Sequence, residues 1–200
     1  MKKFELTSEF VTFLGKTLFR IKALVSFGDV AEGELGGFIE RENNLDQSGD
    51  AWVYGDAQVC GDARVCGDAR VYGDARVYGD ARVYGDAQVY GDAWVFGNAW
   101  VCGNAWVCGD AQVCGDAQVF GDARVQNCRD YSATSCFGSE NRTTTFFRTK
   151  DGGISVRCGC FYGTLREFRE KVKERHGDSR LAKEYLMLAD LMEFRLSKDE

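Results

Sequence analysis

The chain has 200 residues, of which 44% are hydrophobic and 13% aromatic, which is enough to bury a core and argues against wholesale disorder. Its formal net charge is −6 and it has no cluster of Lys and Arg, which disfavours nucleic acid as a partner because polyanion binding needs several cationic contacts. No apolar run approaches the length of a membrane span, so no membrane partner is expected.

Residues 1–48 predict a compact β cap. Two β-rich stretches, 11–14 and 17–21, flank Gly15-Lys16, a pattern that indicates a hairpin. Gly36-Gly37 lacks the strand, loop and helix setting of a phosphate loop, so we interpret it as a turn. The N-terminus has no signal-peptide core and the nine cysteines are odd in number, which together favour reduced thiols and a location in the cytoplasm of a bacterial host.

Residues 49–126 repeat one six-residue word, as in RVYGDA. Val recurs at every sixth position from 53 to 125, and Ala follows each of the first twelve four positions later. Alternation along a strand sends Val71 inward and its neighbours Arg70 and Tyr72 outward. Gly73 then suits a corner with unusual backbone angles, and Ala75 suits the tight inside of the bend.

This spacing of an aliphatic residue and a small residue resembles the hexapeptide repeat of left-handed parallel β-helices. The resemblance implies a mainly β fold in which three hexads form one triangular coil, so that the twelve hexads make about four coils of eighteen residues between two caps. The preceding GGFIE…NL…GDAWV pattern resembles hexapeptide-repeat proteins of phages and prophages, many of unknown function.

An eighteen-residue coil places the outward side chains in vertical columns. No two repeat cysteines are vertical neighbours in these columns, which argues against disulfide ladders and against a metal site along the rod. Arginine in four successive hexads, tryptophan in three more, and tyrosine columns beside them indicate a surface for a ligand or partner. The candidate binding residues are Arg64, Arg70, Arg76, Arg82, Trp94, Trp100, Trp106, Tyr72, Tyr78, Tyr84 and Tyr90.

Two interpretations of these columns stay open. Arginine with aromatic rings can hold phosphates, nucleobases or carboxylates, which favours a small anionic ligand or a host protein. Alternatively, the terminal domains or further copies of the chain cover the aromatic strips. The arginines then only pair with the corner carboxylates of Asp62, Asp68, Asp74 and Asp80.

Residues 127–200 predict a C-terminal cap. The polar stretch with SATS and SENRTTT indicates a linker or an irregular last coil, and 146–148 with 154–158 indicates a hairpin. Cys158 and Cys160 are expected on one strand face, as packed thiols rather than zinc ligands. Thr164 and Glu167 predict a capping box that opens a helix through about residue 175.

A second helix is expected from residue 178 or 179 onward, so the C-terminal cap combines a β-hairpin with a helical hairpin. Its apolar stripe favours a core face but could also dimerise; the stripe comprises Leu181, Tyr185, Leu188, Met192 and Leu196.

The prediction about enzymatic activity depends on where histidine residues lie relative to the coils. Hexapeptide-repeat acyltransferases use a histidine near the coils and gamma-class carbonic anhydrases use three zinc-binding histidines, whereas the one histidine here, His176, lies outside the repeats. No catalytic residue, metal or cofactor is therefore predicted. The leading function is a non-enzymatic β-solenoid binding and assembly protein of phage or prophage type, forming a homo-oligomer.

Three alternatives to this function remain. The first is a phage sponge that sequesters a nucleotide-like host immune signal, with the Arg and Trp coils or a cleft between subunits forming the pocket. The second is an acyltransferase-like enzyme that lacks the usual histidine. The third is a structural component of the phage particle.

Overall fold

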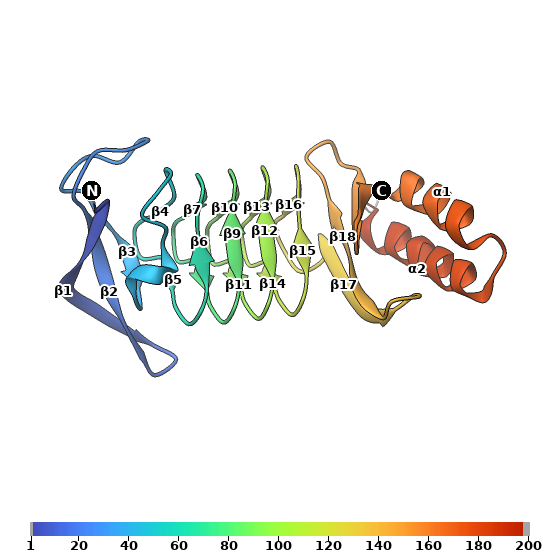
Figure 1. The fold of residues 1–200 in the computed structure, drawn as a ribbon, viewed down its shortest axis with the longest axis horizontal. Coiled ribbons are helices and arrows are strands. Elements are labelled where there is room, and N and C mark those ends of the chain that lie inside the picture. The colour runs from blue at the N-terminus through green and yellow to red at the C-terminus, as the bar shows by residue number, and fades with distance from the viewer. Residues whose placement is uncertain (1, 198–200) are drawn as a thin grey trace.

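The computed structural model describes residues 2–197, which form an elongated rod. Figure 1 shows a β-hairpin at one end, stacked short strands along the middle, and a small sheet with two helices at the other end. The middle is a parallel β-solenoid of about five turns, so the prediction of a mainly β repeat fold is confirmed.

The N-terminal cap is an antiparallel hairpin of β1 (Phe4–Phe13) and β2 (Lys16–Ala23), as the sequence predicts. Its turn residues Leu14 and Gly15 have φ values of 50° and 74°, the left-handed backbone that a tight hairpin requires. Strand β3 (Leu35–Ile39) pairs antiparallel with β2 and parallel with the solenoid strand β5 (Gln58–Val59). The cap is thus continuous with one face of the solenoid.

Gly36 and Gly37 lie within β3, so their prediction as turn residues is wrong. A Cβ atom on Gly36 would lie 2.5 Å from the carbonyl oxygen of Val53, and one on Gly37 would lie 2.5 Å from that of Ala57. The two glycines therefore permit close backbone contact between the cap and the first coil, which is a common reason for glycine inside a strand.

The solenoid has three faces, each a parallel sheet named here by its first repeat strand. The β4 face comprises β4 (Trp52–Val53), β7 (Arg70–Val71), β10 (Gln88–Val89), β13 (Trp106–Val107) and β16 (Arg124–Val125). The β5 face comprises β5, β8 (Arg76–Val77), β11 (Trp94–Val95) and β14 (Gln112–Val113). The β6 face comprises β6 (Arg64–Val65), β9 (Arg82–Tyr84), β12 (Trp100–Cys102) and β15 (Gln118–Val119).

Successive turns pair in a register of eighteen residues. Val71 lies beside Val53 in the turn before and beside Val89 in the turn after. Both the valines and the small Ala75 inside the bend are fully buried. Gly73 has a φ of 72°, and a Cβ atom there would lie 3.0 Å from the amide nitrogen of Gly91, so the corner needs glycine for its backbone angle and for its space.

Partial turns extend the four full turns of the hexads to about five. Before the hexads, β3 pairs with β5, and Leu45 after the short 3-10 helix η1 (Glu42–Asn44) bridges to Val65. After them, β16 adds a further strand to the β4 face. The predicted count of about four coils did not include these partial turns, because β3 and the segment around Leu45 lack the hexad pattern. The left-handed sense stays a prediction from the resemblance.

The C-terminal domain has a four-stranded antiparallel sheet of β17 (Tyr131–Phe137), β18 (Arg142–Arg148), β19 (Ile154–Cys158) and β20 (Phe161–Thr164). The predicted hairpin of β18 and β19 is confirmed. The prediction of a linker or irregular coil is wrong, because that segment forms β17 and the start of β18. Its threonines Thr144 and Thr145 are buried, and Thr145 Oγ1 accepts a hydrogen bond from the Gln118 amide at 3.0 Å, which attaches the sheet to the solenoid.

Helices α1 (Leu165–His176) and α2 (Arg180–Leu196) pack on this sheet, as Figure 1 shows. The capping box is confirmed: Thr164 Oγ1 accepts from the Glu167 amide at 3.2 Å and Glu167 Oε2 accepts from the Thr164 amide at 2.8 Å. Ser179 caps α2, whose predicted stripe is buried apart from the half-buried Leu181. Neither helix has the length and apolar character needed to cross a membrane.

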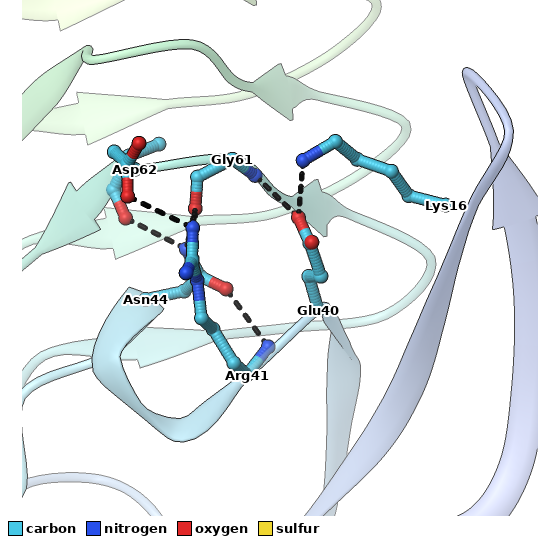
Figure 2. A network of polar contacts seen from close by, with 7 residues as sticks. Lys16, Glu40, Arg41, Asn44, Gly61 and Asp62 are labelled. Atoms are coloured by element: carbon cyan, nitrogen blue, oxygen red, sulfur yellow. Dashed lines mark hydrogen bonds and ion pairs between the residues drawn. The ribbon is translucent and has the colours of Figure 1, made fainter.

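A polar network closes the corner at residues 61–63 of the first turn, where side chains of the preceding segment bond the backbone between the pairing at β3 and the bridge at Leu45 (Figure 2). Asn44 Nδ2 donates to the carbonyl oxygens of Gly61 and Ala63 at 3.0 and 2.9 Å. Arg41 Nη2 donates to the same Gly61 oxygen at 2.6 Å. Glu40 Oε2 accepts from the Gly61 amide at 2.6 Å and from Lys16 Nζ at 2.8 Å, which joins the hairpin to the solenoid.

Glu40 predicts an acid-sensitive contribution to stability. The hydrogen bond from Lys16, together with that from the Gly61 amide, holds the pKa of Glu40 below its ordinary 4.5. Its carboxylate therefore stabilises the fold above that pH, and the contribution is lost as the pH falls through the lower folded-state pKa. We expect Glu40→Gln to lower the free energy of unfolding by about 1 kcal/mol near neutral pH, measured by denaturant titration.

The difference between wild type and Glu40→Gln should shrink when the titration is repeated in acid, well below the ordinary pKa. Glu32→Gln, which removes an exposed carboxylate from the same cap, serves as the control and should change stability little at either pH. A difference that stayed constant from neutral to acid pH would contradict this assignment.

Candidate functional site

The outer side of the β4 face carries a continuous row of aromatic contacts. The rings of Tyr72 and Tyr90 stack in parallel with centroids 4.9 Å apart. Tyr54 meets Tyr72 edge-on at 6.4 Å, and Trp106 meets Tyr90 edge-on at 6.2 Å. The guanidinium of Arg124 lies 4.1 Å from the Trp106 ring centroid. We call these five residues the β4-face ladder; it runs along the whole length of this face.

A hollow of about 310 Å³ lies beside the N-terminal end of the ladder. Asp29, from the loop between β2 and β3, accepts hydrogen bonds at one carboxylate oxygen from Tyr54 Oη at 2.9 Å and from Arg70 Nη2 at 3.1 Å. Tyr72 Oη donates to Gln88 Oε1 at 2.9 Å. The lining side chains are thus bonded to one another, and the charge of Arg70 is matched by a carboxylate.

The ladder tyrosines are neutral hydrogen-bonding groups at physiological pH. Burial raises the pKa of Tyr54 far above its usual range, and the bonded Asp29 carboxylate raises it further. Burial also raises the pKa of Tyr72. The pKa of Tyr90 rises to about 12, first through burial and then through the Cys108 thiol. Each phenol therefore keeps its proton across the pH range of a cell.

The N-terminal hairpin partly covers the β5 face. Tyr78 stacks on Phe96 at 5.0 Å, and Phe13 of β1 packs against it edge-on at 5.7 Å. Arg76 lies between two rings, 5.1 Å from Phe13 and 5.2 Å from Trp94. Coverage by a terminal domain, one of the two interpretations of the strips, is therefore correct for this part of the rod.

The β6 face carries a shorter aromatic contact and meets the C-terminal domain at its far end. The ring centroids of Trp100 and Tyr84 lie 6.2 Å apart in an edge-on contact. The Arg82 guanidinium carbon lies 5.2 Å from the Trp100 ring centroid. Arg157 of β19 lies 5.0 Å from the ring centroid of Phe120.

The structure therefore distributes the predicted binding residues over three faces instead of one site. The β4 face holds Arg70, Tyr72, Tyr90 and Trp106; the β5 face holds Arg76, Tyr78 and Trp94; the β6 face holds Arg64, Arg82, Tyr84 and Trp100.

The alternative in which the repeat arginines pair with corner aspartates is wrong. Arg70 pairs with Asp29, whereas Arg76 and Arg82 lie over tryptophan rings. Within residues 2–197 no ion pair joins Arg64, Arg70, Arg76 or Arg82 to Asp62, Asp68, Asp74 or Asp80. The column geometry explains this, because the side chain one turn away in the same column lies only about 5 Å along the rod.

Sequence reasoning missed three residues of the hollow as site residues: Asp29, Tyr54 and Gln88. The eighteen-residue spacing could have found Tyr54 and Gln88, since each shares a column with a predicted residue. Asp29 belongs to an aperiodic loop, held in part by the bridge between Phe27 and Val30, and gives no sequence signal for this contact.

The cysteines and the histidine are the side chains best suited to act as nucleophiles or metal ligands, so their surroundings determine whether they can take those roles. The cysteines are free thiols, and burial raises the pKa of Cys60, Cys66 and Cys102, which keeps these thiols protonated and poor as nucleophiles. His176 ends α1 and stacks on Tyr185 at 5.6 Å. Among the described residues no group of three or more His, Cys, Asp and Glu side chains is placed to hold a metal ion.

Cys158 and Cys160 do not share a strand face, contrary to prediction. Cys158 is the last residue of β19, whereas Cys160 lies exposed in the turn that follows. The chain leaves the strand at Gly159, whose φ of 57° reverses its direction.

Comparison with known families supports the repeat assignment. The segments 57–73, 63–77, 75–87 and 87–103 match the family described as the YdcK beta solenoid repeat. All four lie between residues 57 and 103 of the solenoid. Comparison with curated proteins gives no match. The array is thus a β-solenoid repeat similar to that family.

The hollow predicts a specific change on removing the charge of Asp29. Because this carboxylate raises the pKa of Tyr54, Asp29→Asn should lower the pH at which one tyrosine ionises, measured from tyrosinate absorbance during alkaline titration. Tyr54→Phe in the same background assigns the shifted group, and Asp74→Asn at an exposed corner is the matched control. Titration curves that coincide for Asp29→Asn and wild type would refute the contact.

Proposed function

We propose that this protein is a non-enzymatic binding and assembly protein that engages a protein partner through the β4-face ladder. The observation that carries this proposal is the unbroken row from Tyr54 to Arg124. Tyrosine, tryptophan and arginine are the residue types most enriched in the energetic centres of protein interfaces. The phage or prophage setting and the bacterial cytoplasm are parts of the same proposal.

The rigidity of the rod supports this function. The stacked rings of Tyr72 and Tyr90 are held by neighbours on both sides, so their side chains have little freedom left to lose when a partner binds. Their hydroxyl groups can donate and accept hydrogen bonds while the rings supply apolar area. This combination suits a flat, partly polar partner surface.

The sponge alternative is less well supported at the hollow beside the ladder. A nucleotide-like signal needs uncompensated positive charge, whereas Arg70 in the hollow is already paired with Asp29 at 3.1 Å. The acyltransferase alternative would need an activated group beside the coils. The protonated thiols of Cys60, Cys66 and Cys102 support a binding role over that chemistry.

We also propose that a second copy of the chain joins through α2. Met187, Leu191 and Phe194 are 72%, 56% and 83% exposed and recur at the spacing of one helix face. Such a stripe is characteristic of an interaction surface, and a two-fold axis through it would bury the same residues of both copies. The two surfaces lie on different parts of the rod, so assembly through α2 leaves the ladder free.

Site-specific photocrosslinking tests both proposals. A photoreactive amino acid is placed at Trp106 on the β4 face, at Trp100 on the β6 face or at Phe194 on α2, in the bacterium that carries the gene. Trp106 and Trp100 occupy the same position in their hexads, so they form a matched pair. We expect one discrete adduct with another protein at Trp106, no such adduct at Trp100, and an adduct of two chains at Phe194, each identified by mass spectrometry.

The outcomes separate the two proposals. The same adduct pattern at Trp106 and Trp100, or none at either, would overturn binding through the β4 face. Recovery of only the single chain from Phe194 would overturn self-association through α2 and leave the ladder proposal standing.

A further inference from the structure

A second and larger cavity lies in the C-terminal domain, away from the ladder. It encloses about 580 Å³ between the turn that joins β17 and β18, the turn that joins β19 and β20, and the side of α1. Ligand pockets for small molecules usually occupy roughly 300 to 1,000 Å³. The cavity therefore has room for a complete small molecule.

Aromatic rings form one wall of the cavity and brace one another. Phe168 of α1 lies 5.5 Å from Phe161 and 5.9 Å from Tyr185 of α2, measured between ring centroids. Tyr185 Oη also accepts a hydrogen bond from the Ser139 amide at 3.3 Å, which holds the β17–β18 turn against the helix. Both Phe168 and Tyr185 are largely buried, so this wall is formed before any ligand arrives.

Cations gather around the cavity although the chain is acidic overall. Its lining includes Arg142, Lys171 and Arg175, against the single carboxylate of Glu140. Arg142 is only 3.9 Å from Glu140, in a pair whose side chains are both 60% exposed, and such exposed pairs hold their partners weakly. Among the described residues no ion pair engages Arg175. Lys171 pairs with Glu174 at 2.8 Å, so the positive charge that is open to a ligand is that of Arg142 and Arg175.

We propose that this cavity binds a small organic anion that carries a flat aromatic ring, of the chemical class of aromatic phosphates that includes nucleoside monophosphates. The ring would pack on the wall of Phe161, Phe168 and Tyr185, where offset and edge contacts between rings are favourable. The phosphate would lie between Arg142 and Arg175, since guanidinium groups bind phosphate through paired, charge-assisted hydrogen bonds. This site is independent of the ladder and of the function proposed for it.

Calorimetric titration of the full chain tests this proposal with three aromatic phosphates: adenosine monophosphate, uridine monophosphate and phenyl phosphate. Adenosine lacks the phosphate charge, so it measures the binding of the ring alone. Inorganic phosphate lacks the ring, so it measures the binding of the charge alone. We expect at least one aromatic phosphate to bind at least about tenfold more tightly than both adenosine and inorganic phosphate.

A matched pair of variants locates the binding. Arg175→Glu and Lys173→Glu both place a negative charge in the last turn of α1, so both lose the same favourable interaction with the helix terminus. Only Arg175 lines the cavity. We expect Arg175→Glu to weaken aromatic phosphate binding at least about tenfold, and Lys173→Glu to leave it unchanged.

A chemical readout gives an independent check in the unmodified protein. Cys160 lines the cavity and is exposed, while the exposed Cys128 lies outside it. The bound phosphate should slow alkylation of Cys160 by iodoacetamide and leave Cys128 unaffected, as measured by peptide mass spectrometry. The proposal is overturned if none of the three compounds binds better than inorganic phosphate, if the two charge variants weaken binding equally, or if Cys160 gains no protection.

Discussion

Parallel hydrogen bonding between turns eighteen residues apart is the constraint on which the rest of the structure depends. The Arg70 amide donates to the Ala87 carbonyl at 2.9 Å, and the Tyr72 amide donates to the Val89 carbonyl at 3.0 Å, a pattern that recurs from turn to turn. The same register stacks valine on valine and corner glycine on corner glycine. Because the hexads are nearly identical, a slip of six residues would keep the core contacts and move each outer side chain to another face.

The outer surface takes its properties from this register. A repeat arginine meets the side chain of the next turn in its own column, so Arg76 and Arg82 lie over tryptophan rings and not beside corner carboxylates. The caps then make the three faces different, although the repeats are alike. The hairpin packs Phe13 on the β5 face and the C-terminal sheet packs Arg157 on the β6 face. The β4 face retains the longest row of aromatic contacts.

Much of the fold could be predicted because it is encoded locally. The six-residue period gives the buried valines and the corner glycines, and Thr164 with Glu167 marks the start of α1. The errors occur where the conformation of a segment is determined by packing against segments that are distant in the sequence. Thr144 and Thr145 look like a polar linker but are buried in β18, and Gly36 looks like a turn but makes close contact with the first coil. The contact of Asp29 with Arg70 and the C-terminal cavity arise only when distant segments meet, so no short motif could predict them.

The measurement that tests this account most directly is disulfide mapping of the single variant Tyr84→Cys under mild oxidation. In the register described here, position 84 lies directly beside Cys102 of the next turn, and Cys66 lies one turn earlier in the same column. Parallel neighbours about 5 Å apart are within the range that a disulfide can span. The account predicts that the introduced thiol joins Cys66 or Cys102. A disulfide to Cys60 or Cys108, each twenty-four residues away, would indicate a coil of four hexads and would contradict the register on which the ladder and the three faces depend.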